Sequence, residues 1–289
     1  MRRKTLRVVA LVALVLGIAS CGSRGGRMTA SESEQDSLQD VPVDSQETVM
    51  PTDYEERVEE LSGPTQRTEA FSDFFFSFLN DRRFQADRVK FPLHLTNVKG
   101  EKRTITRGSD FREYFAWPNA DEYMLLLSNE AQMEHFQNAM DLTEIEVQVI
   151  DLKRLTIKGF DFSRAEKQWK LLEGREYIPH GVYYDFLRFY QRFSTDNDFQ
   201  TQSLARPLVY TMPDPDDERG EITGTLDPEQ WPAFRPDLPR DVVSNILFGQ
   251  NLEQTRQITL VHCGIASGLL DVFTFRLVGE RWQLVSFKS

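Results

Sequence analysis

The stretch FSDFFFSFLNDRRFQADRVKFPL (residues 71–93) returns about 115 residues later as FLRFYQRFSTDNDFQTQSLARPL (residues 186–208). The two copies align without a gap, and each half ends alike, with Trp169 in EKQWKL and Trp282 in ERWQL. The matched pairs are Phe71 and Phe186, Phe74 and Phe189, Phe75 and Tyr190, Phe78 and Phe193, Asp81 and Asp196, Phe84 and Phe199, Gln85 and Gln200, Pro92 and Pro207, and Leu93 and Leu208. Solenoid units have periods of roughly 20 to 50 residues, so a repeat of this length is a whole domain. The chain is therefore a tandem duplication.

Each copy begins with an aromatic stripe that predicts a helix packed on a core. In the first copy, Phe71, Phe74, Phe75 and Phe78 follow the i, i+3, i+4, i+7 spacing of one helix face. Downstream in the first half we expect strands over 89–95 and 102–107, a short helix over 109–115, a strand over 123–127, a helix over 130–140, and strands over 144–151, 152–163 and 167–175. In the second half we expect a helix over 183–194, an exposed acidic loop over 212–221, and strands over 245–248 (answering 124–127), 257–264, 269–278 and 281–288.

This α+β order of elements resembles the nuclear transport factor 2-like superfamily, on the evidence of the two helix stripes and the strands around Trp169 and Trp282. The resemblance implies two tandem cone-shaped domains, each a curved antiparallel sheet wrapped on a long helix. The repeated block is also similar to an uncharacterised family of lipoproteins from Bacteroidetes-type bacteria. Related domains commonly pair through their sheets, so the resemblance also implies an intrachain pseudo-dimer of the two halves. The aliphatic side chains that we expect between them are Val147, Val149, Leu260 and Phe273.

The N-terminal sequence is typical of a lipoprotein signal peptide. A basic start, MRRKTLR, precedes the apolar run Val8 to Ala19, which spans roughly 18 Å as a helix and is too short for a bilayer core of about 30 Å. The run ends in Ile18-Ala19-Ser20-Cys21, which resembles the bacterial lipobox; an ordinary signal peptide with a nearby cysteine is the alternative. We expect lipid (palmitate among its acyl chains) on Cys21, export, and a lipid anchor in the membrane. The lack of Asp after Cys21 favours the outer over the inner membrane.

Composition and charge bound the remaining possibilities. We expect a signal peptide over 1–20, a flexible acidic tether over 21–62, and domains over 63–178 and 179–289. Loss of the four basic residues in 1–20 would change the formal charge from −11 to −15, which disfavours nucleic acid as a partner. The other cysteine, Cys263, lies in an apolar strand-like run and is expected to be a buried, inert thiol.

The candidate site residues are few. Asp81 with Gln85, and Asp196 with Gln200, recur in both halves; they either grip a ligand at the mouth of each cone, or Asp caps the short second helix while Gln ties that helix to a strand. The capping interpretation is favoured, because no acid–base partner is repeated with them. The remaining candidates for a pocket are His94, Tyr114 and Tyr123. Neither a metal-ligand cluster nor a cofactor motif is present in the sequence, so we expect no metal and no cofactor.

Three functions fit these observations. The favoured one is non-catalytic binding of a small ligand or a partner protein in the cell envelope. The second is an isomerase, dehydratase or hydrolase that uses one cone, with His94, Tyr114 or Tyr123 as its acid–base group. The third is a structural assembly subunit. The sequence names neither the ligand nor the partner.

Overall fold

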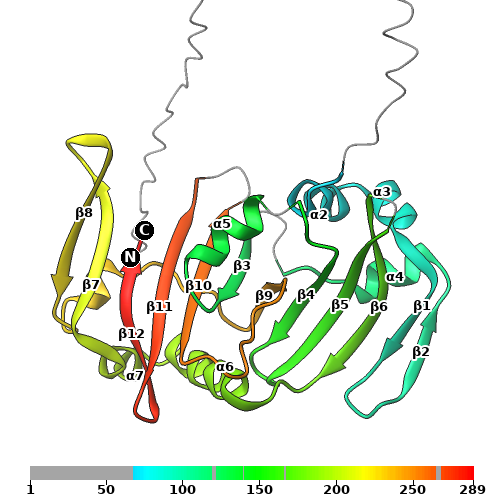
Figure 1. Ribbon diagram of the computed structural model, residues 1–289. Coiled ribbons are helices and arrows are strands. Elements are labelled where there is room, and N and C mark those ends of the chain that lie inside the picture. Colours follow the sequence, from blue (N-terminus) through cyan, green and yellow to red (C-terminus); the bar gives the residue numbers. More distant parts are fainter. Residues whose placement is uncertain (1–67, 119–121, 139, 166, 265–267) are drawn as a thin grey trace, which may run out of the picture. The chain divides into compact units, whose positions relative to one another are not determined.

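The structure, a computed structural model, describes residues 68–289 except 119–121, 139, 166 and 265–267 (Figure 1). The predicted signal peptide, Cys21 and the tether lie outside the described residues. Within the described part of the chain, no helix is long and apolar enough to cross a membrane.

The described elements follow the predicted α+β order in both repeats. The first repeat consists of α2 (Phe71–Asn80), α3 (Arg82–Asp87), β1 (Val89–Thr96), β2 (Lys102–Ile105), α4 (Gly108–Tyr114), β3 (Glu122–Leu127), α5 (Ala131–Asn138), β4 (Glu144–Asp151), β5 (Thr156–Ala165) and β6 (Gln168–Tyr177). The second consists of α6 (Gly181–Phe193), α7 (Asn197–Gln202), β7 (Leu204–Asp214), β8 (Asp217–Leu226), α8 (Trp231–Phe234), β9 (Val242–Leu247), β10 (Gln257–Gly264), β11 (Leu270–Val278) and β12 (Arg281–Lys288). The predicted boundary at 178/179 falls between β6 and α6.

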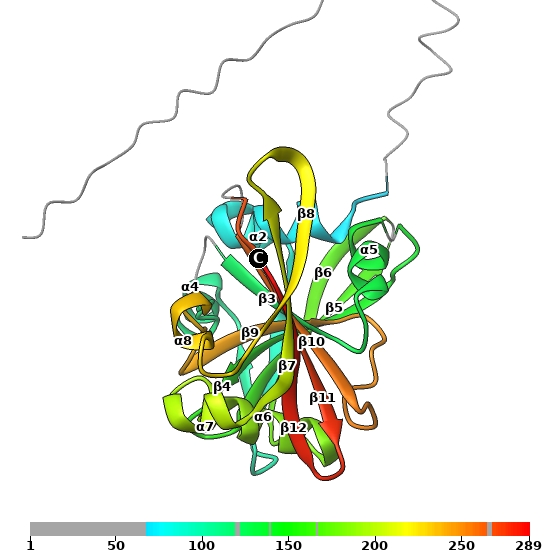
Figure 2. The same ribbon diagram turned by 90° about the vertical axis from the view of Figure 1, so that its left-hand side faces the viewer.

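The predicted acidic loop over 212–221 is shorter than expected. β7 runs to Asp214 and β8 starts at Asp217, so only 215–216 turn between the strands, and the pairing shifts register after Pro213. Figure 2, which looks onto the second repeat, shows this long hairpin with α7 and α8 near it. The acidic composition of the segment suggested a solvated loop, but acidic residues are also accommodated on the exposed faces of a paired hairpin.

The aromatic stripes are buried as predicted. Phe71, Phe74, Phe75 and Phe78 of α2 are all buried, and each packs edge-on against Phe162. Phe71 also packs edge-on against Trp169. In the second repeat, Phe186 and Phe193 pack edge-on against Phe275 in the same way. Aromatic side chains thus fill the space between each long helix and its sheet.

The two repeats exchange a strand. One sheet has the order β2-β1-β6-β5-β4-β9 and the other β8-β7-β12-β11-β10-β3, so each takes its sixth strand from the other repeat (Figure 1). Antiparallel pairing joins β9 to β4 and β3 to β10. Neither sheet is wholly antiparallel, because β1 pairs with β6, and β7 with β12, in parallel. Parallel neighbours need a long connection, and here nearly a whole repeat separates them.

The register shows how the exchanged strands correspond. Leu127 ends β3 opposite Thr259, and Leu247 ends β9 opposite Glu146. Thr259 and Glu146 are equivalent, since each lies opposite the residue that precedes the bulge in the next strand. Residues 244–247 therefore match 124–127. The correspondence predicted from the sequence, 245–248 with 124–127, is off by one residue.

Polar side chains in β9 and just after it form hydrogen bonds with the backbone of β3, along the edge of β3 that does not pair with β10. The backbone N–H of Met124 donates to Ser244 Oγ (2.8 Å), and that of Leu126 donates to Asn245 Oδ1 (2.7 Å). Gln250 Nε2 donates to the carbonyl of Leu126 (3.3 Å). Buried backbone groups need such partners, so these polar residues stabilise the crossing of the two exchanged strands.

The residues expected between the halves belong to the cores instead. Val147 and Val149 lie in the core around α2, whereas Leu260 and Phe273 lie in the core around α6. The alternate positions of the same strands reach across: Ile150 joins the second core, and Val261, Cys263 and Val272 join the first. Successive side chains on a strand point to opposite faces, so the prediction assigned the strands correctly and their faces wrongly.

Candidate functional site

The repeated Asp and Gln residues serve the fold. Asp81 caps α3 by accepting from the backbone N–H groups of Arg83 (2.8 Å) and Phe84 (3.1 Å), and Asp196 caps α7 by accepting from Phe199 N (2.9 Å). The capping interpretation is confirmed.

The glutamines tie helices together. Gln85 Nε2 donates to the carbonyl of Phe78 (3.1 Å), and Gln200 Nε2 donates to that of Phe193 (2.9 Å). The predicted tie to a strand is therefore wrong: each Gln joins the short helix to the end of the long helix before it. Gln200 Oε1 also accepts from Trp231 Nε1 (2.9 Å).

The other three candidates are not brought together. His94 is exposed on β1, with its Nδ1 3.4 Å from Thr104 Oγ1 on β2. Tyr114 is half-buried beside Phe160, with Lys158 over its ring, and burial raises the pKa of its phenol. Tyr123 lies opposite Cys263 on β10, and burial raises the pKa of both groups. Cys263 is buried, as predicted, and its raised pKa makes it a poor nucleophile.

A histidine and two carboxylates meet where β3, β10 and β11 adjoin. His262 Nε2 lies 3.0 Å from Glu122 Oε2, and the β10–β11 register sets Asp271 opposite His262. Among the described residues, His262 Nδ1 and one oxygen of Asp271 have no hydrogen-bond partner. Sequence analysis missed this group, because only the hairpin register and the exchanged strand bring the three residues together.

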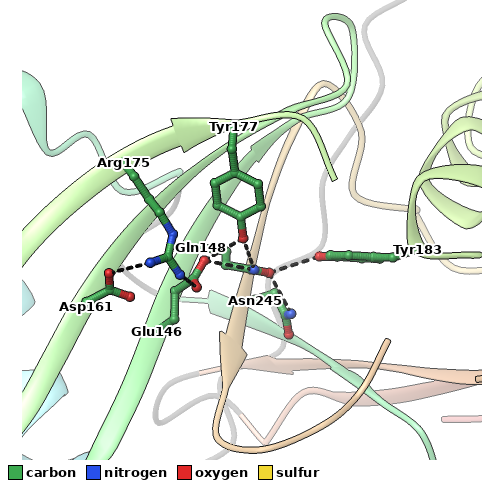
Figure 3. Close-up of polar contacts among 7 residues, drawn as sticks. All are labelled: Glu146, Gln148, Asp161, Arg175, Tyr177, Tyr183 and Asn245. Atoms are coloured by element: carbon green, nitrogen blue, oxygen red, sulfur yellow. Dashed lines mark hydrogen bonds and ion pairs between the residues drawn. The ribbon is translucent and has the colours of Figure 1, made fainter. Parts of the chain in front are cut away.

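A larger polar network crosses the junction of the repeats (Figure 3). Glu146 accepts from Arg175, from Tyr177 OH (2.6 Å) and from Gln148 Nε2 (3.1 Å). The network continues into the second repeat through Gln148 Oε1, which accepts from Tyr183 OH and Asn245 Nδ2, both at 2.9 Å. All four bonding positions of the buried Gln148 amide are used, because Nε2 also donates to Tyr177 OH (2.7 Å). The network therefore joins the repeats and leaves this amide nothing to offer a substrate.

At the exposed end of this network, a carboxyl group has a raised pKa. Arg175 Nη1 donates to Asp161 Oδ2 (2.8 Å). Burial nevertheless raises the pKa of the Asp161 carboxyl to about 6; nearby Glu146 adds to this effect and Arg175 opposes it. The register places threonines, Thr259 and Thr274, where the first repeat has Glu146 and Asp161. The charged set is thus not repeated.

A cavity of about 810 Å³ opens in the second repeat between α6, α7 and the β11–β12 turn. Its charged lining consists of Arg188, Arg192, Arg256, Arg281, Asp185 and Glu280. Its apolar and aromatic lining includes Val182, Phe189, Phe199, Leu277 and Trp282. Four arginines against two carboxylates make the cavity locally basic on a chain of formal charge −11.

Two of the arginines are held in place and two are free to meet a ligand. Arg192 stacks on Phe199, 4.2 Å from the ring centroid, and its Nε donates to Asp196 Oδ2 (3.1 Å). Arg256 Nη2 donates to the carbonyl of Leu277 in β11 (3.2 Å) and to that of Gly279 in the β11–β12 turn (3.1 Å). Arg188 and Arg281 are exposed, and no side chain or carbonyl of the described residues bonds to either guanidinium.

In the first repeat the chain itself occupies the equivalent place. Glu69, just before α2, accepts from Arg88 with both carboxylate oxygens (2.8 and 3.0 Å). Its carbonyl accepts from Trp169 Nε1 (3.1 Å), and its carboxylate accepts from Trp169 N (3.1 Å). In the second repeat, Trp282 Nε1 is buried and has no acceptor among the described residues. The indole N–H therefore has an acceptor within the chain in the first repeat and no described acceptor in the second.

A family model described as a domain of unknown function (DUF4348) matches residues 51–289. The chain belongs to this family. It is also similar to the crystal structure of an NTF2-like protein from Bacteroides fragilis NCTC 9343, with 31% sequence identity and a TM-score of 0.68. That match covers 78% of this chain and 98% of the other. Among curated proteins, none matches the chain. The predicted fold, tandem nuclear transport factor 2-like domains, is thereby confirmed.

For this DUF4348 chain, the residues that sequence analysis missed are those that the two copies do not share. Arg188, Arg192 and Arg281 have no basic counterparts in the repeat alignment, where Asp73, Ser77 and Gln168 stand in their places. The signal that could have found them is the gain of basic residues around a conserved aromatic frame. Across the described residues, no group of His, Cys, Asp and Glu could hold a metal ion.

Proposed function

We propose that this DUF4348 protein is a non-catalytic, lipid-anchored binding protein of the bacterial cell envelope, and that its second repeat binds an anionic ligand. The observation that carries the proposal is the arginine-lined cavity of about 810 Å³. Ligand pockets commonly have volumes of roughly 300 to 1,000 Å³ and combine an apolar lining with a few polar groups. Arginine recognises carboxylate and phosphate groups with two parallel hydrogen bonds.

Electrostatics favours an anion in this cavity. Asp185 and Glu280 also line the cavity, but among the described residues neither Arg188 nor Arg281 forms an ion pair, and Arg192 keeps its terminal nitrogens free after bonding to Asp196 through Nε. Hydrogen bonds to charged groups contribute about 1.5 to 3 kcal/mol each. The surrounding negative charge of the chain would repel unspecific anions, so a ligand must gain its affinity from these directed contacts.

Two observations favour binding over catalysis. The Asp and Gln residues that recur in both copies are used as helix caps and helix ties, and aromatic side chains fill the space under each long helix. The acid–base group at His262 does not line the arginine cavity. The geometry therefore offers recognition of charge at the cavity, and no proton-transfer pair there.

The anchor is proposed from the lipobox-like sequence that ends in Cys21, with residues 21–62 as the tether between lipid and domains. A single acyl chain binds membranes only marginally, whereas several chains anchor a protein durably. Growth with labelled palmitate tests this: the wild-type chain should incorporate label and partition with outer membranes, and Cys21→Ser should do neither. Equal labelling of the Cys21→Ser variant would exclude this site of lipidation.

Thermal unfolding of the full chain in mild detergent tests the binding site. Citrate, phosphate and glutarate should be compared with neutral analogues on the wild type, on Arg188→Gln/Arg192→Gln and on Arg276→Gln. Arg276 is an exposed arginine of β11 outside the cavity and serves as the matched control. A ligand at 100 times its Kd stabilises by about 2.7 kcal/mol, which is several degrees for a chain of this size. Stabilisation that the double variant abolishes supports the proposal. Absence of any anion effect, or an effect that the double variant retains, would refute it.

A further inference from the structure

We infer that the ligand of the second-repeat cavity is an extended peptide segment of a partner protein, bound through a glutamate side chain and the carbonyl of the same residue. This inference rests on the proposed function and narrows it. The first of the two copies of the fold already holds such a segment, supplied by its own chain.

The first repeat provides the template. Residues 68–70 precede α2 in a non-helical conformation, and Ala70 has extended backbone angles (φ −67°, ψ 143°). Glu69 uses its carboxylate, its carbonyl and its N–H together: Arg88 and Trp169 N bind the carboxylate, Trp169 Nε1 binds the carbonyl, and Glu69 N donates to Lys167 O (3.3 Å). One acidic residue in an extended chain therefore satisfies both the guanidinium and the indole.

In the second repeat a guanidinium lies over the equivalent phenyl ring, although it comes from a different element. Arg88 lies 4.4 Å from the centroid of Phe84, and Arg192 lies 4.2 Å from that of Phe199, the repeat equivalent of Phe84. The repeat equivalent of Arg88 itself is Ser203, since the carbonyls of these two residues accept from Leu171 N and Leu284 N at 2.8 and 2.9 Å. In the second repeat, the cation over the phenyl ring therefore comes from α6 and not from the residue equivalent to Arg88.

The indole of the second repeat lacks the acceptor that the first repeat supplies. Trp169 Nε1 donates to Glu69 O, whereas Trp282 Nε1 is buried with no described acceptor. A buried donor without a partner is destabilising, so a ligand carbonyl that reaches the indole once the side chains around it move aside would offset that cost. The site thus offers a carboxylate the terminal nitrogens of Arg192, which the ion pair with Asp196 leaves unused, and offers a carbonyl the unpaired indole donor.

The chain's own backbone cannot fill this site as it fills the first. The repeat alignment pairs Glu69 with Tyr184, but α6 starts at Gly181, so Tyr184 lies inside a helix. Its carbonyl faces along the helix and its segment is not extended. The longer α6 thereby leaves the second site open to a segment of another protein. The four arginines that line the cavity favour a segment with acidic side chains.

Calorimetric titration of the full chain in mild detergent tests the inference with a peptide copied from the first repeat. The probe is acetyl-TQRTEAF-amide, the sequence of residues 65–71, and its control carries Gln in place of Glu. We expect the Glu peptide to bind and the Gln peptide to bind at least about tenfold more weakly, from the loss of a charge-assisted hydrogen bond. Arg192→Gln should weaken the Glu peptide by a similar factor, and Arg276→Gln should not change it.

The outcomes separate this inference from the proposed function. If citrate or phosphate binds but neither peptide does, the peptide inference is overturned and an anion-binding site remains. Equal binding of the Glu and Gln peptides, or binding of the Glu peptide that Arg192→Gln leaves unchanged, also overturns it. If neither peptides nor small anions bind, both proposals fall together.

Discussion

Gly159→Ala is predicted to destabilise the protein, although Gly→Ala in a strand ordinarily does the opposite. Gly159 lies in β5, opposite Gln148 of β4 and Arg175 of β6. A Cβ built there overlaps Glu146 Oε1, lies 2.9 Å from Glu146 Cδ and lies 3.2 Å from Tyr177 Cε1. Observed Cβ atoms do not approach other atoms this closely, so the Glu146 side chain must move.

The cost follows from what holds Glu146. Its side chain is only 11% exposed and accepts from Arg175, Tyr177 and Gln148. Displacement breaks or lengthens these hydrogen bonds, and buried groups that lose a partner cost roughly 1 to 3 kcal/mol each. Alanine returns about 0.5 to 1 kcal/mol through the lower entropy of the unfolded chain. We therefore expect a net loss of about 2 to 4 kcal/mol in the free energy of unfolding.

Urea denaturation measures this loss, with Gly108→Ala as the matched control. A Cβ at Gly108 meets only Ala86 Cβ at 3.5 Å, which is ordinary van der Waals contact. This control should be neutral or stabilising by up to about 1 kcal/mol. If Gly159→Ala is as neutral as Gly108→Ala, the network does not constrain Glu146.

A double-mutant cycle identifies the clash as the cause. In a Glu146→Ala background, the two closest contacts of the new methyl at Gly159 are removed and the next is the Tyr177 ring, so Gly159→Ala should cost less than about 1 kcal/mol. The coupling between the two substitutions should then be about 1 to 4 kcal/mol. An undiminished cost in the absence of Glu146 would refute the reasoning, because the damage would then arise elsewhere in the strand.

Three further substitutions test other parts of the fold. Asn245→Leu removes the side-chain acceptor of the Leu126 backbone N–H, and chemical denaturation should show a loss of about 2 to 3 kcal/mol. Glu69→Gln leaves the guanidinium of Arg88, which is 13% exposed, without its carboxylate, and tryptophan fluorescence during unfolding should show a loss of about 1 to 3 kcal/mol. The pKa of Asp161 is about 6 in the folded chain, above its ordinary value of 3.8, so the folded state binds its proton more tightly. That contribution to stability is present below pH 3.8 and is lost as the pH rises through 6, and unfolding series between pH 4 and 7 should show a flatter profile for Asp161→Asn.

Local patterns predicted the elements and their caps. The stripe from Phe71 to Phe78 predicted α2 and its buried face, because helical spacing and burial are both written in a short stretch of sequence. Asp81 predicted the start of α3 for the same reason, since a cap acts over two or three residues. These predictions succeeded because the interactions are local.

The strand exchange could not be predicted from such patterns. Leu125 and Leu127 of β3 need a buried sheet edge, and either sheet could supply one, so an exchanged and an unexchanged arrangement have the same apolar pattern. The crossing has a local sign in the polar residues Ser244 and Asn245, which interrupt the apolar strand β9. The equivalent positions of β3 hold the apolar residues Met124 and Leu125. Buried polar residues in an apolar strand indicate a nearby backbone that needs partners, and here that backbone is β3.

The candidate site was missed for a related reason, and the cause bears on how any duplicated domain should be interpreted. Residues kept in both copies, such as Asp81 and Asp196, are those that every copy of the fold requires. A ligand site need exist only once, so its residues are expected among the differences. Here the difference is specific: Glu69 occupies one site from within the chain, whereas a longer helix withdraws the equivalent segment from the other and Arg192 restores the cation. Arg192 also pairs with the helix cap Asp196, but that pair uses Nε alone and leaves both terminal nitrogens to an external carboxylate. A guanidinium over the ring equivalent to Phe84, with those nitrogens unused, is the strongest argument that the second site binds something from outside.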